Sequence, residues 1–195
     1  MKRLLNEFED LIDPKLMPRK RKELMHHLSG FADGEGCFNV SLKKQKTARF
    51  GWVLDPVFHV TQHRDNRIIL EMFKRVLTCG RIIEKHGQKD TFQFMVDNRR
   101  QLIEKIIPFF ERYRLIVKRK DFELFKKIVI GLEAKKHGDL NEFKKLLEKA
   151  FEMNQSGKQR RYKQNDVLND LDLLGSSEAI RQTPEKKKAE DAKKR

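Results

Sequence analysis

Residues 28–36 read Leu-Ser-Gly-Phe-Ala-Asp-Gly-Glu-Gly, and the interpretation of the whole chain starts from this stretch. It closes a segment in which apolar residues recur at i, i+4, i+7 and i+8, the spacing of one helix face: Leu24, Leu28, Phe31 and Ala32. The helix is expected to begin near Lys22 and to end at Gly34-Glu35-Gly36, because glycine is a natural helix stop.

The end of this helix carries two carboxylates, Asp33 and Glu35. The helix macrodipole disfavours acids at a C-terminus unless a cation lies nearby. Magnesium is a hard cation that takes one or two carboxylates together with phosphate oxygens. Inside the helix stand Ser29 and Gly30, although glycine costs a helix about 1 kcal/mol relative to alanine. The segment therefore predicts a divalent-metal site at its end and close backbone packing along its length.

After residue 36 the apolar period changes to two, which is typical of half-buried strands. Pro56 lies in the inward row of the second strand, so a bulge or an edge position is expected there. Asp65 and Asp97 are expected to cap the helices that follow. The expected elements are strands at 38–43 and 54–61, a helix at 65–79, strands at 81–85 and 91–96, and helices at 97–108, 118–136 and 139–153.

Hairpins separated by helices predict an α+β fold, with an antiparallel curved β-sheet, helices on one face in the order αββαββα, and additional C-terminal helices. The expected division is an N-terminal lead-in at 1–20 and the main folded domain at 21–153. A helical and basic extension follows at 154–175, and a lysine-rich tail, expected to be disordered, covers 176–195.

The chain is strongly basic, with a formal net charge of +15 over 195 residues. The lysine-rich end does not account for this, because residues 158–195 carry only +4 and the preceding part carries +11. A basic folded body favours a polyanionic partner. No apolar run approaches the roughly 20 residues that span a bilayer, so no membrane association and an intracellular location are expected. The two cysteines are expected to be buried thiols.

The sheet face away from the helices is expected to be polar, with more cations than acids, and so to read DNA through phosphates and base edges. An ordinary solvated sheet face is the alternative. The expected DNA-binding residues are Asn39, Ser41, Lys43, Gln45, His59, Arg81, Lys85 and Gln93 on the sheet, with Arg64 and Arg67 just beyond it.

The segment from Leu28 to Gly36 resembles the signature helix of the LAGLIDADG homing endonucleases, with Leu28, Gly30, Asp33 and Gly36 matching the motif. Glu35 stands at the last acidic position. The order of helices and strands is similar to the family core, and the resemblance covers roughly residues 20–135. It implies two signature helices packed about a twofold axis, with the terminal acid of each binding metal beside a scissile phosphate.

One copy of the motif is found, so the resemblance implies a homodimer that reads a pseudo-palindromic site in double-stranded DNA. The implied dimer interface contains Leu28, Ser29, Gly30 and Asp33. The implied metal ligands are Glu35 and the Gly34 carbonyl, for Mg²⁺ or another divalent cation such as Mn²⁺. Asp33 is expected to be structural, capping or bonding at the partner helix.

The resemblance implies two further catalytic residues. Gln62, at the end of the second strand, is the candidate for positioning water, and Lys118 is the candidate for stabilising phosphate charge. An ordinary lysine at the start of a basic helix is an equal alternative for Lys118. Asn66 stands where some family members carry an arginine.

The leading hypothesis is thus a metal-dependent, intron-encoded DNA endonuclease in the bacterial or archaeal cytoplasm or in an organelle. The alternative on the same scaffold is a non-cutting RNA maturase, with RNA as partner, or a DNA-binding regulator. A basic RNA- or ribosome-associated structural protein is a third class. The acid at Glu35 favours the nuclease.

Overall fold

The computed structural model describes residues 21–154 and 161–173. The expected lead-in at 1–20 and the tail after residue 175 lie outside these ranges. The first described helix, α2 (Arg21–Glu35), leads directly into the hairpin of β1 (Gly36–Lys44) and β2 (Trp52–His63). The chain continues through α3 (Arg67–Leu77), β3 (Arg81–Glu84) and β4 (Thr91–Val96), and this confirms the predicted order.

The four strands form one antiparallel sheet in the order β1-β2-β4-β3. β2 is one of the two inner strands: it pairs with β1 from Gly36↔Val60 to Lys44↔Trp52, and with β4 only from residue 58 onward. Pro56 therefore lies where β2 has a free edge, and the register passes through it without a bulge. A missing backbone N–H is tolerated at such an edge.

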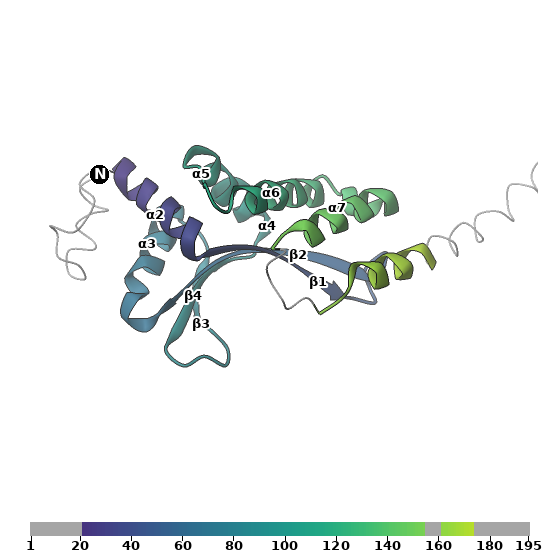
Figure 1. Cartoon of the computed structure of the whole chain (residues 1–195), viewed down its shortest axis with the longest axis horizontal. Helices are drawn as coiled ribbons and strands as arrows, with labels where there is room; N and C mark the ends of the chain where they lie inside the picture. Colours follow the sequence, from purple (N-terminus) through teal and green to yellow (C-terminus); the bar gives the residue numbers. More distant parts are fainter. Residues whose placement is uncertain (1–20, 155–160, 174–195) are drawn as a thin grey trace, which may run out of the picture.

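Helices cover one face of the sheet (Figure 1). After β4 come α4 (Arg99–Gln101), a π-helical turn (Leu102–Ile106) and α5 (Ile107–Arg112) in unbroken succession. The predicted end at Pro108 is wrong. Proline lacks an N–H and crowds the carbonyl four residues earlier, and the wider π turn before it lets the helix continue.

The remaining helices are α6 (Arg119–Glu133), α7 (Leu140–Glu152) and a helix at residues 164–173. Val167 and Leu171 of that last helix are buried in the same core as the rest of the chain. Asp139, the expected start of the last predicted helix, caps α7. The two expected caps are wrong: α3 has no side-chain cap, and Asn98, not Asp97, caps α4.

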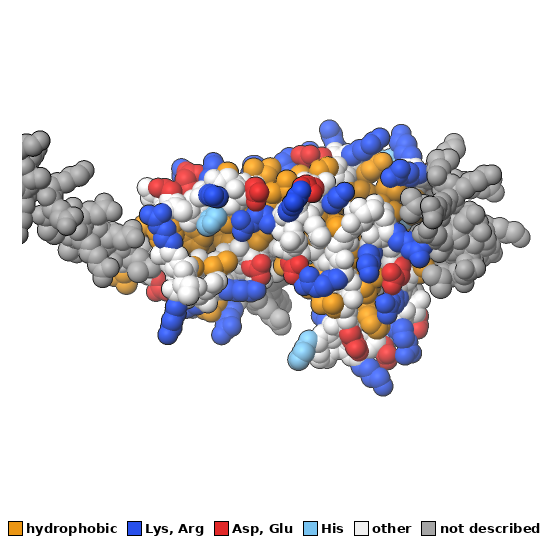
Figure 2. Space-filling view, turned by 180° about the vertical axis from the view of Figure 1, so that it is seen from behind, with side chains coloured by type: hydrophobic (Ala, Val, Ile, Leu, Met, Phe, Trp, Pro, Cys, Tyr) orange, Lys and Arg blue, Asp and Glu red, His pale blue; other side chains and the backbone are white. Residues whose placement is uncertain are grey.

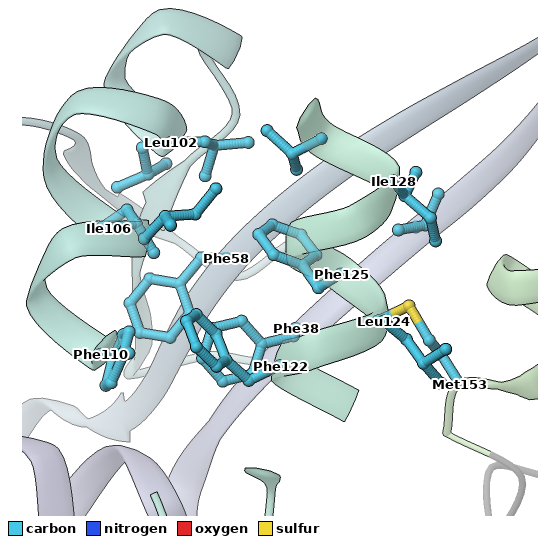
Figure 3. Packing of buried hydrophobic residues seen from close by; sticks show 14 of the residues in the cluster. Phe38, Phe58, Leu102, Ile106, Phe110, Phe122, Leu124, Phe125, Ile128 and Met153 are labelled. Carbon is cyan, nitrogen blue, oxygen red and sulfur yellow. The ribbon is translucent and has the colours of Figure 1, made fainter. Parts of the chain in front are cut away.

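Aromatic side chains fill the space between the sheet and the helices (Figure 3). Phe38 of β1 and Phe58 of β2 lie 5.0 Å apart between ring centroids, and Phe110 of α5 lies 5.2 Å from each of them. Phe125 of α6 packs at 5.4 Å from Phe38. Rings from both strands of the hairpin and from two helices thus meet at one point, and this fixes the helix layer on the sheet.

Phe58 sits at the centre of this cluster and is fully buried. We expect Phe58→Ala to lower the free energy of unfolding by about 3–5 kcal/mol. The side chains around the resulting cavity are held in several different elements and cannot all move in to fill it. Ile130→Ala is the control, since that side chain is 48% exposed. Urea unfolding of both variants measures the difference, and equal losses would contradict this account of the core.

Candidate active site and nucleic-acid interface

The junction between α2 and β1 presents Glu35 to solvent. A Cβ on Gly36 would lie 2.6 Å from the Ala32 carbonyl oxygen, so the chain can turn from helix to strand here only with glycine. Among the residues that the structure describes, the Glu35 carboxylate has no hydrogen-bond or ion-pair partner. It is therefore available to a ligand outside the chain.

Asp33 faces into the protein and holds the loop before α6. Its carboxylate accepts hydrogen bonds from the backbone N–H groups of Ile116 (2.8 Å), Val117 (2.9 Å) and Lys118 (2.8 Å). Partial burial raises the pKa of Asp33, but these hydrogen bonds and the Lys118 charge outweigh it, so the pKa lies below its usual value of 3.8. The expectation that Asp33 is structural agrees with these bonds, which are made within the chain.

Lys118 adds side-chain hydrogen bonds from the start of α6 to the backbone of α2. Its ammonium donates to the carbonyl oxygens of Asp33 at 2.6 Å and of Gly34 at 2.5 Å. These are carbonyls of the last turn of α2, where a cation also balances the helix dipole. The lysine singled out from the sequence is thereby placed beside the residue that precedes Glu35, although 84 residues separate them along the chain.

Gln62 lies at the end of β2 that adjoins α2. Val60 pairs with Gly36, so Gln62, two residues further on, stands at the strand end nearest to Glu35. The Asn66 amide donates to the Gln62 side-chain oxygen at 3.4 Å. Asn66, which replaces the arginine of some family members, is thus a neighbour of Gln62 and adds no charge there. A role for Gln62 in positioning water stays a prediction.

Three of the four expected dimer residues face their own chain: Asp33 through its bonds to residues 116–118, and Leu28 and Ser29 through burial. Leu28 is fully buried in the core, and Ser29, 3% exposed, donates from its hydroxyl to the Tyr113 carbonyl oxygen at 2.6 Å. Their assignment to an interface is wrong, because α2 uses that side to pack on its own chain. Gly30 is exposed, and a Cβ there would meet nothing within 4 Å. The outward face of α2 consists of Glu23, His27, Gly30 and Gly34.

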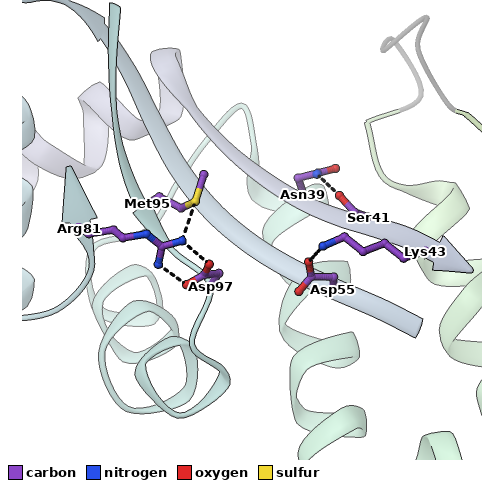
Figure 4. Close-up of polar contacts among 7 residues, drawn as sticks. All are labelled: Asn39, Ser41, Lys43, Asp55, Arg81, Met95 and Asp97. Atoms are coloured by element: carbon purple, nitrogen blue, oxygen red, sulfur yellow. Dashed lines mark hydrogen bonds and ion pairs between the residues drawn. The ribbon is translucent and has the colours of Figure 1, made fainter. Parts of the chain in front are cut away.

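The outward face of the sheet carries the polar residues expected from strand alternation (Figure 4). Asn39 donates to the Ser41 hydroxyl at 3.0 Å, and Gln93 donates to the Thr61 hydroxyl at 2.9 Å. Gln45 begins the turn after β1 and donates to Thr47. These side chains lie on the accessible side, where they could meet base edges.

The expected excess of cations over acids on this face is smaller than predicted, because Asp55 and Asp97 offset Lys43 and Arg81. Lys43 binds Asp55 at 2.5 Å, and the two terminal guanidinium nitrogens of Arg81, Nη1 and Nη2, bind Asp97 at 2.7 and 2.6 Å. Beyond the sheet, Arg64 binds Asp90 at 3.0 Å and Arg67 binds Glu71 at 3.3 Å. Lysine and arginine are likewise mixed with acids over the side of the molecule in Figure 2. The parity of β2 would have revealed Asp55 on this face.

Lys85 differs from these four cations, because no carboxylate among the described residues pairs with it. It acts on His59 in the middle of the face: burial lowers the pKa of His59, and the Lys85 charge lowers it further. His59 is therefore neutral at pH 7 and can donate or accept one hydrogen bond at each ring nitrogen.

The two cysteines are free thiols, Cys79 buried and Cys37 half-buried. Burial raises the pKa of both, that of Cys79 to about 11. Neither thiol is ionised at neutral pH, so neither offers the thiolate that binds soft metals.

The residues at the end of α2 fit a hard divalent cation held at an open site. Glu35 offers free carboxylate oxygens, whereas the Gly34 carbonyl oxygen accepts from the Lys118 ammonium and could bind a metal only after that ammonium moved away. No cluster of three or more His, Cys, Asp or Glu side chains that could hold a metal occurs within 21–154 and 161–173. Such a set matches magnesium, which usually binds through one or two carboxylates, substrate phosphates and water. The remaining ligands would have to come from outside this chain.

Comparison with known proteins agrees with this geometry. The model of the LAGLIDADG endonuclease family matches residues 28–129, which is more than half of the chain. The chain belongs to the LAGLIDADG endonuclease family. Its match begins at Leu28, the first residue of the signature segment, and ends within α6, so it includes the whole sheet.

Two curated LAGLIDADG relatives illustrate the similarity. The chain is 45% identical to DNA endonuclease I-CeuI of Chlamydomonas moewusii over 86 residues, covering 44% of this chain and 39% of that protein. It is 36% identical to homing endonuclease I-ApeII of Aeropyrum pernix over 111 residues, covering 57% of this chain and 65% of that protein. The chain thus spans less than two thirds of the length of either relative.

Solved LAGLIDADG structures share the fold. The archaeal intron-encoded homing endonuclease I-Vdi141I, complexed with DNA, superposes with a TM-score of 0.74 at 38% identity, covering 78% of this chain and 97% of that one. The group I intron-encoded I-CeuI, also complexed with DNA, gives 0.69 at 30% identity, with 87% and 86% covered. I-SmaMI, 28% identical with a TM-score of 0.62, was solved on uncleaved DNA with calcium ions; 68% of this chain and 45% of that one are covered.

None of the helices in the described part of the chain is long and apolar enough to cross a membrane.

We expect Asp33→Asn to lower the free energy of unfolding at pH 7 by about 1–3 kcal/mol, since an amide replaces the acceptor of three N–H groups. The folded-state pKa is depressed, so the carboxylate stabilises the protein above about pH 4, and this contribution is lost as the pH falls through the folded-state value. Wild type and variant should therefore converge in stability at acid pH. Urea unfolding from pH 7 to pH 3 measures this, and a constant difference would contradict it.

Proposed function

We propose that two copies of this chain form a homing endonuclease that makes a metal-dependent double-strand break at a long, pseudo-palindromic DNA site. The observation that carries the proposal is Glu35, a solvent-facing carboxylate at the end of α2, with Lys118 fixed beside it. The DNA complexes of I-Vdi141I and I-CeuI support DNA as the partner. Encoding within an intron and an intracellular location belong to the same proposal.

The residues at the end of α2 would divide the chemistry among them. Glu35 and the Gly34 carbonyl would hold Mg²⁺, or another divalent cation such as Mn²⁺. The bound metal would activate water and neutralise charge building on phosphorus and the leaving oxygen. Gln62 would orient the attacking water from the end of β2. Lys118, whose ammonium donates to the Gly34 carbonyl in the protein alone, would move to a phosphate oxygen, where it would stabilise the phosphate charge and leave the carbonyl to the metal.

A homodimer is required because each chain supplies one such carboxylate, and a double-strand break needs two cutting sites. The outward face of α2, with Gly30 and Gly34 open to solvent, would let two such helices approach closely. Beside its end, Ile116 and Val117 are 87% and 81% exposed and are held there by Asp33. Their exposure supports burial against a second copy of the chain. An isologous dimer of this kind reads two symmetric half-sites.

The nuclease is tested with a duplex that joins the host sequences on either side of the insertion. We expect the wild type with Mg²⁺ to cut both strands. Glu35→Gln should bind the duplex with unchanged affinity but cut it at least about 10²- to 10³-fold more slowly. Glu148→Gln, at an exposed position of α7, is the charge-matched control and should cut normally. Binding without cutting by the wild type would instead favour a maturase or a regulator.

The dimer is tested by placing bulk on α2. Gly30→Leu should leave the monomer folded, because a Cβ there meets nothing within 4 Å. It should raise the dimer dissociation constant at least about tenfold, since a clash between closely packed helices costs more than about 1.4 kcal/mol. Sedimentation velocity over a concentration series gives the result. Lys127→Leu adds an exposed leucine to α6 as the control. Equal dimerisation of both variants would refute this interface.

A further inference from the structure

Two carboxylates lie on the sheet face that is proposed to meet DNA. Asp55 is an outward residue of β2 opposite Ser41, and Asp97 directly follows the end of β4 (Figure 4). A carboxylate repels phosphate, so acids on such a face act against general affinity for DNA. Their position calls for a role other than simple attraction.

Each carboxylate is bound to a cation that would otherwise be free to contact DNA. Lys43 donates to Asp55 at 2.5 Å, and Arg81 makes a two-pronged pair with Asp97 at 2.7 and 2.6 Å. One Arg81 nitrogen also lies 3.5 Å from the Met95 sulfur, which helps to fix the guanidinium over the sheet. The two pairs are therefore defined arrangements within this face.

Stability does not account for these pairs. The side chains of Lys43 and Arg81 are 62% and 53% exposed, and those of their partners 35% and 34%. Ion pairs at such exposure contribute little to folding. Their larger consequence is electrostatic, because a paired cation presents almost no net charge to a polyanion. The hydrogen bonds from Arg81 lower the pKa of Asp97, and the Lys43 charge lowers it slightly further, so the two pairs are electrostatic neighbours.

Pairing also changes what each side chain can recognise. A guanidinium has five N–H donors, and Asp97 engages two of its nitrogens, so donors remain for a guanine edge. A carboxylate can accept a hydrogen bond from the cytosine amino group but has no favourable contact with a phosphate. A face built from such pairs therefore responds to base edges more than to the DNA backbone.

We propose that Asp55 and Asp97 are specificity-determining residues that mask Lys43 and Arg81, lowering affinity for DNA of arbitrary sequence. The inference rests on the proposed DNA-binding function and assigns to it two residues that do not themselves attract the polymer. Asp97 remains ionised at neutral pH, because the hydrogen bonds from Arg81 hold its pKa below the usual value. The ion pair between Arg81 and Asp97 therefore persists at neutral pH, and it separates only when the cation finds a competing partner.

The test uses a fluorescent 30-base-pair duplex of mixed sequence that lacks the insertion site. Binding is followed by anisotropy between 50 and 300 mM salt. We expect Asp55→Asn and Asp97→Asn each to bind about three- to tenfold more tightly at 100 mM salt, with the log–log salt slope steeper by about 0.9 for one additional phosphate contact. Glu111→Gln is the control, because it removes an equal charge from an ion pair with Lys126 on the helical side. It should change the affinity less than about twofold.

A second experiment, in protein that carries Arg81→Gln, distinguishes masking of the guanidinium from simple repulsion between Asp97 and phosphate. In Arg81→Gln protein no guanidinium remains to be freed, so adding Asp97→Asn should leave the salt slope unchanged. The same gain in slope with and without Arg81 would overturn masking.

Other outcomes distinguish the inference from the proposed function. If the wild type binds the duplex and the two asparagine variants behave like Glu111→Gln, the inference falls and DNA binding stands. If the wild type shows no salt-dependent binding, the proposed function itself fails, and the masking role fails with it. Thermal unfolding of each variant verifies that the fold is intact.

Discussion

The geometry of the site depends on the carboxylate of Asp33. It accepts three consecutive backbone N–H groups from residues 116–118 and so joins the end of α2 to the start of α6. Lys118 closes the connection by donating to carbonyls of the last α2 turn. Two segments more than 80 residues apart are thereby locked together. The acids of the signature segment consequently differ in role: Asp33 faces inward and builds the site, and Glu35 faces outward and is left for a ligand.

The sequence could predict that Asp33 and Glu35 lie together at the end of a helix, because that prediction needs only local patterns. Helical and strand periods gave the element order, and the change of period at residue 36 located the helix end where Glu35 is exposed. The wider resemblance to the family, outside the signature motif, implied Lys118, which no local pattern distinguishes from the other lysines of the chain. Its position is a long-range contact, and only resemblance or structure reveals it.

The wrong predictions concern residues to which a local sequence rule was applied, but whose side chains make contacts with residues far away in the sequence. Ser29 is small, as a helix contact requires, but its hydroxyl is taken by the Tyr113 carbonyl 84 residues away. Leu28 already belonged to the apolar period, which should have outweighed its place in the motif. Asp97 is a residue type that often caps helices, but its carboxylate binds Arg81 of β3, and Asn98 caps α4 instead. Short polar side chains have several possible partners, and the nearest in sequence is not always chosen.

Charge shows the same limit on a larger scale. The sequence establishes that the body is basic, but a net charge has no direction, and the face expected to carry the excess cations is largely compensated by its own acids. Long-range attraction and sequence reading therefore need not come from the same residues. In the proposed function, cations elsewhere on the body would draw DNA to the protein from a distance. The paired side chains of the sheet, fixed and nearly neutral, then gain most from a duplex whose base edges offer better partners than the ones they already have.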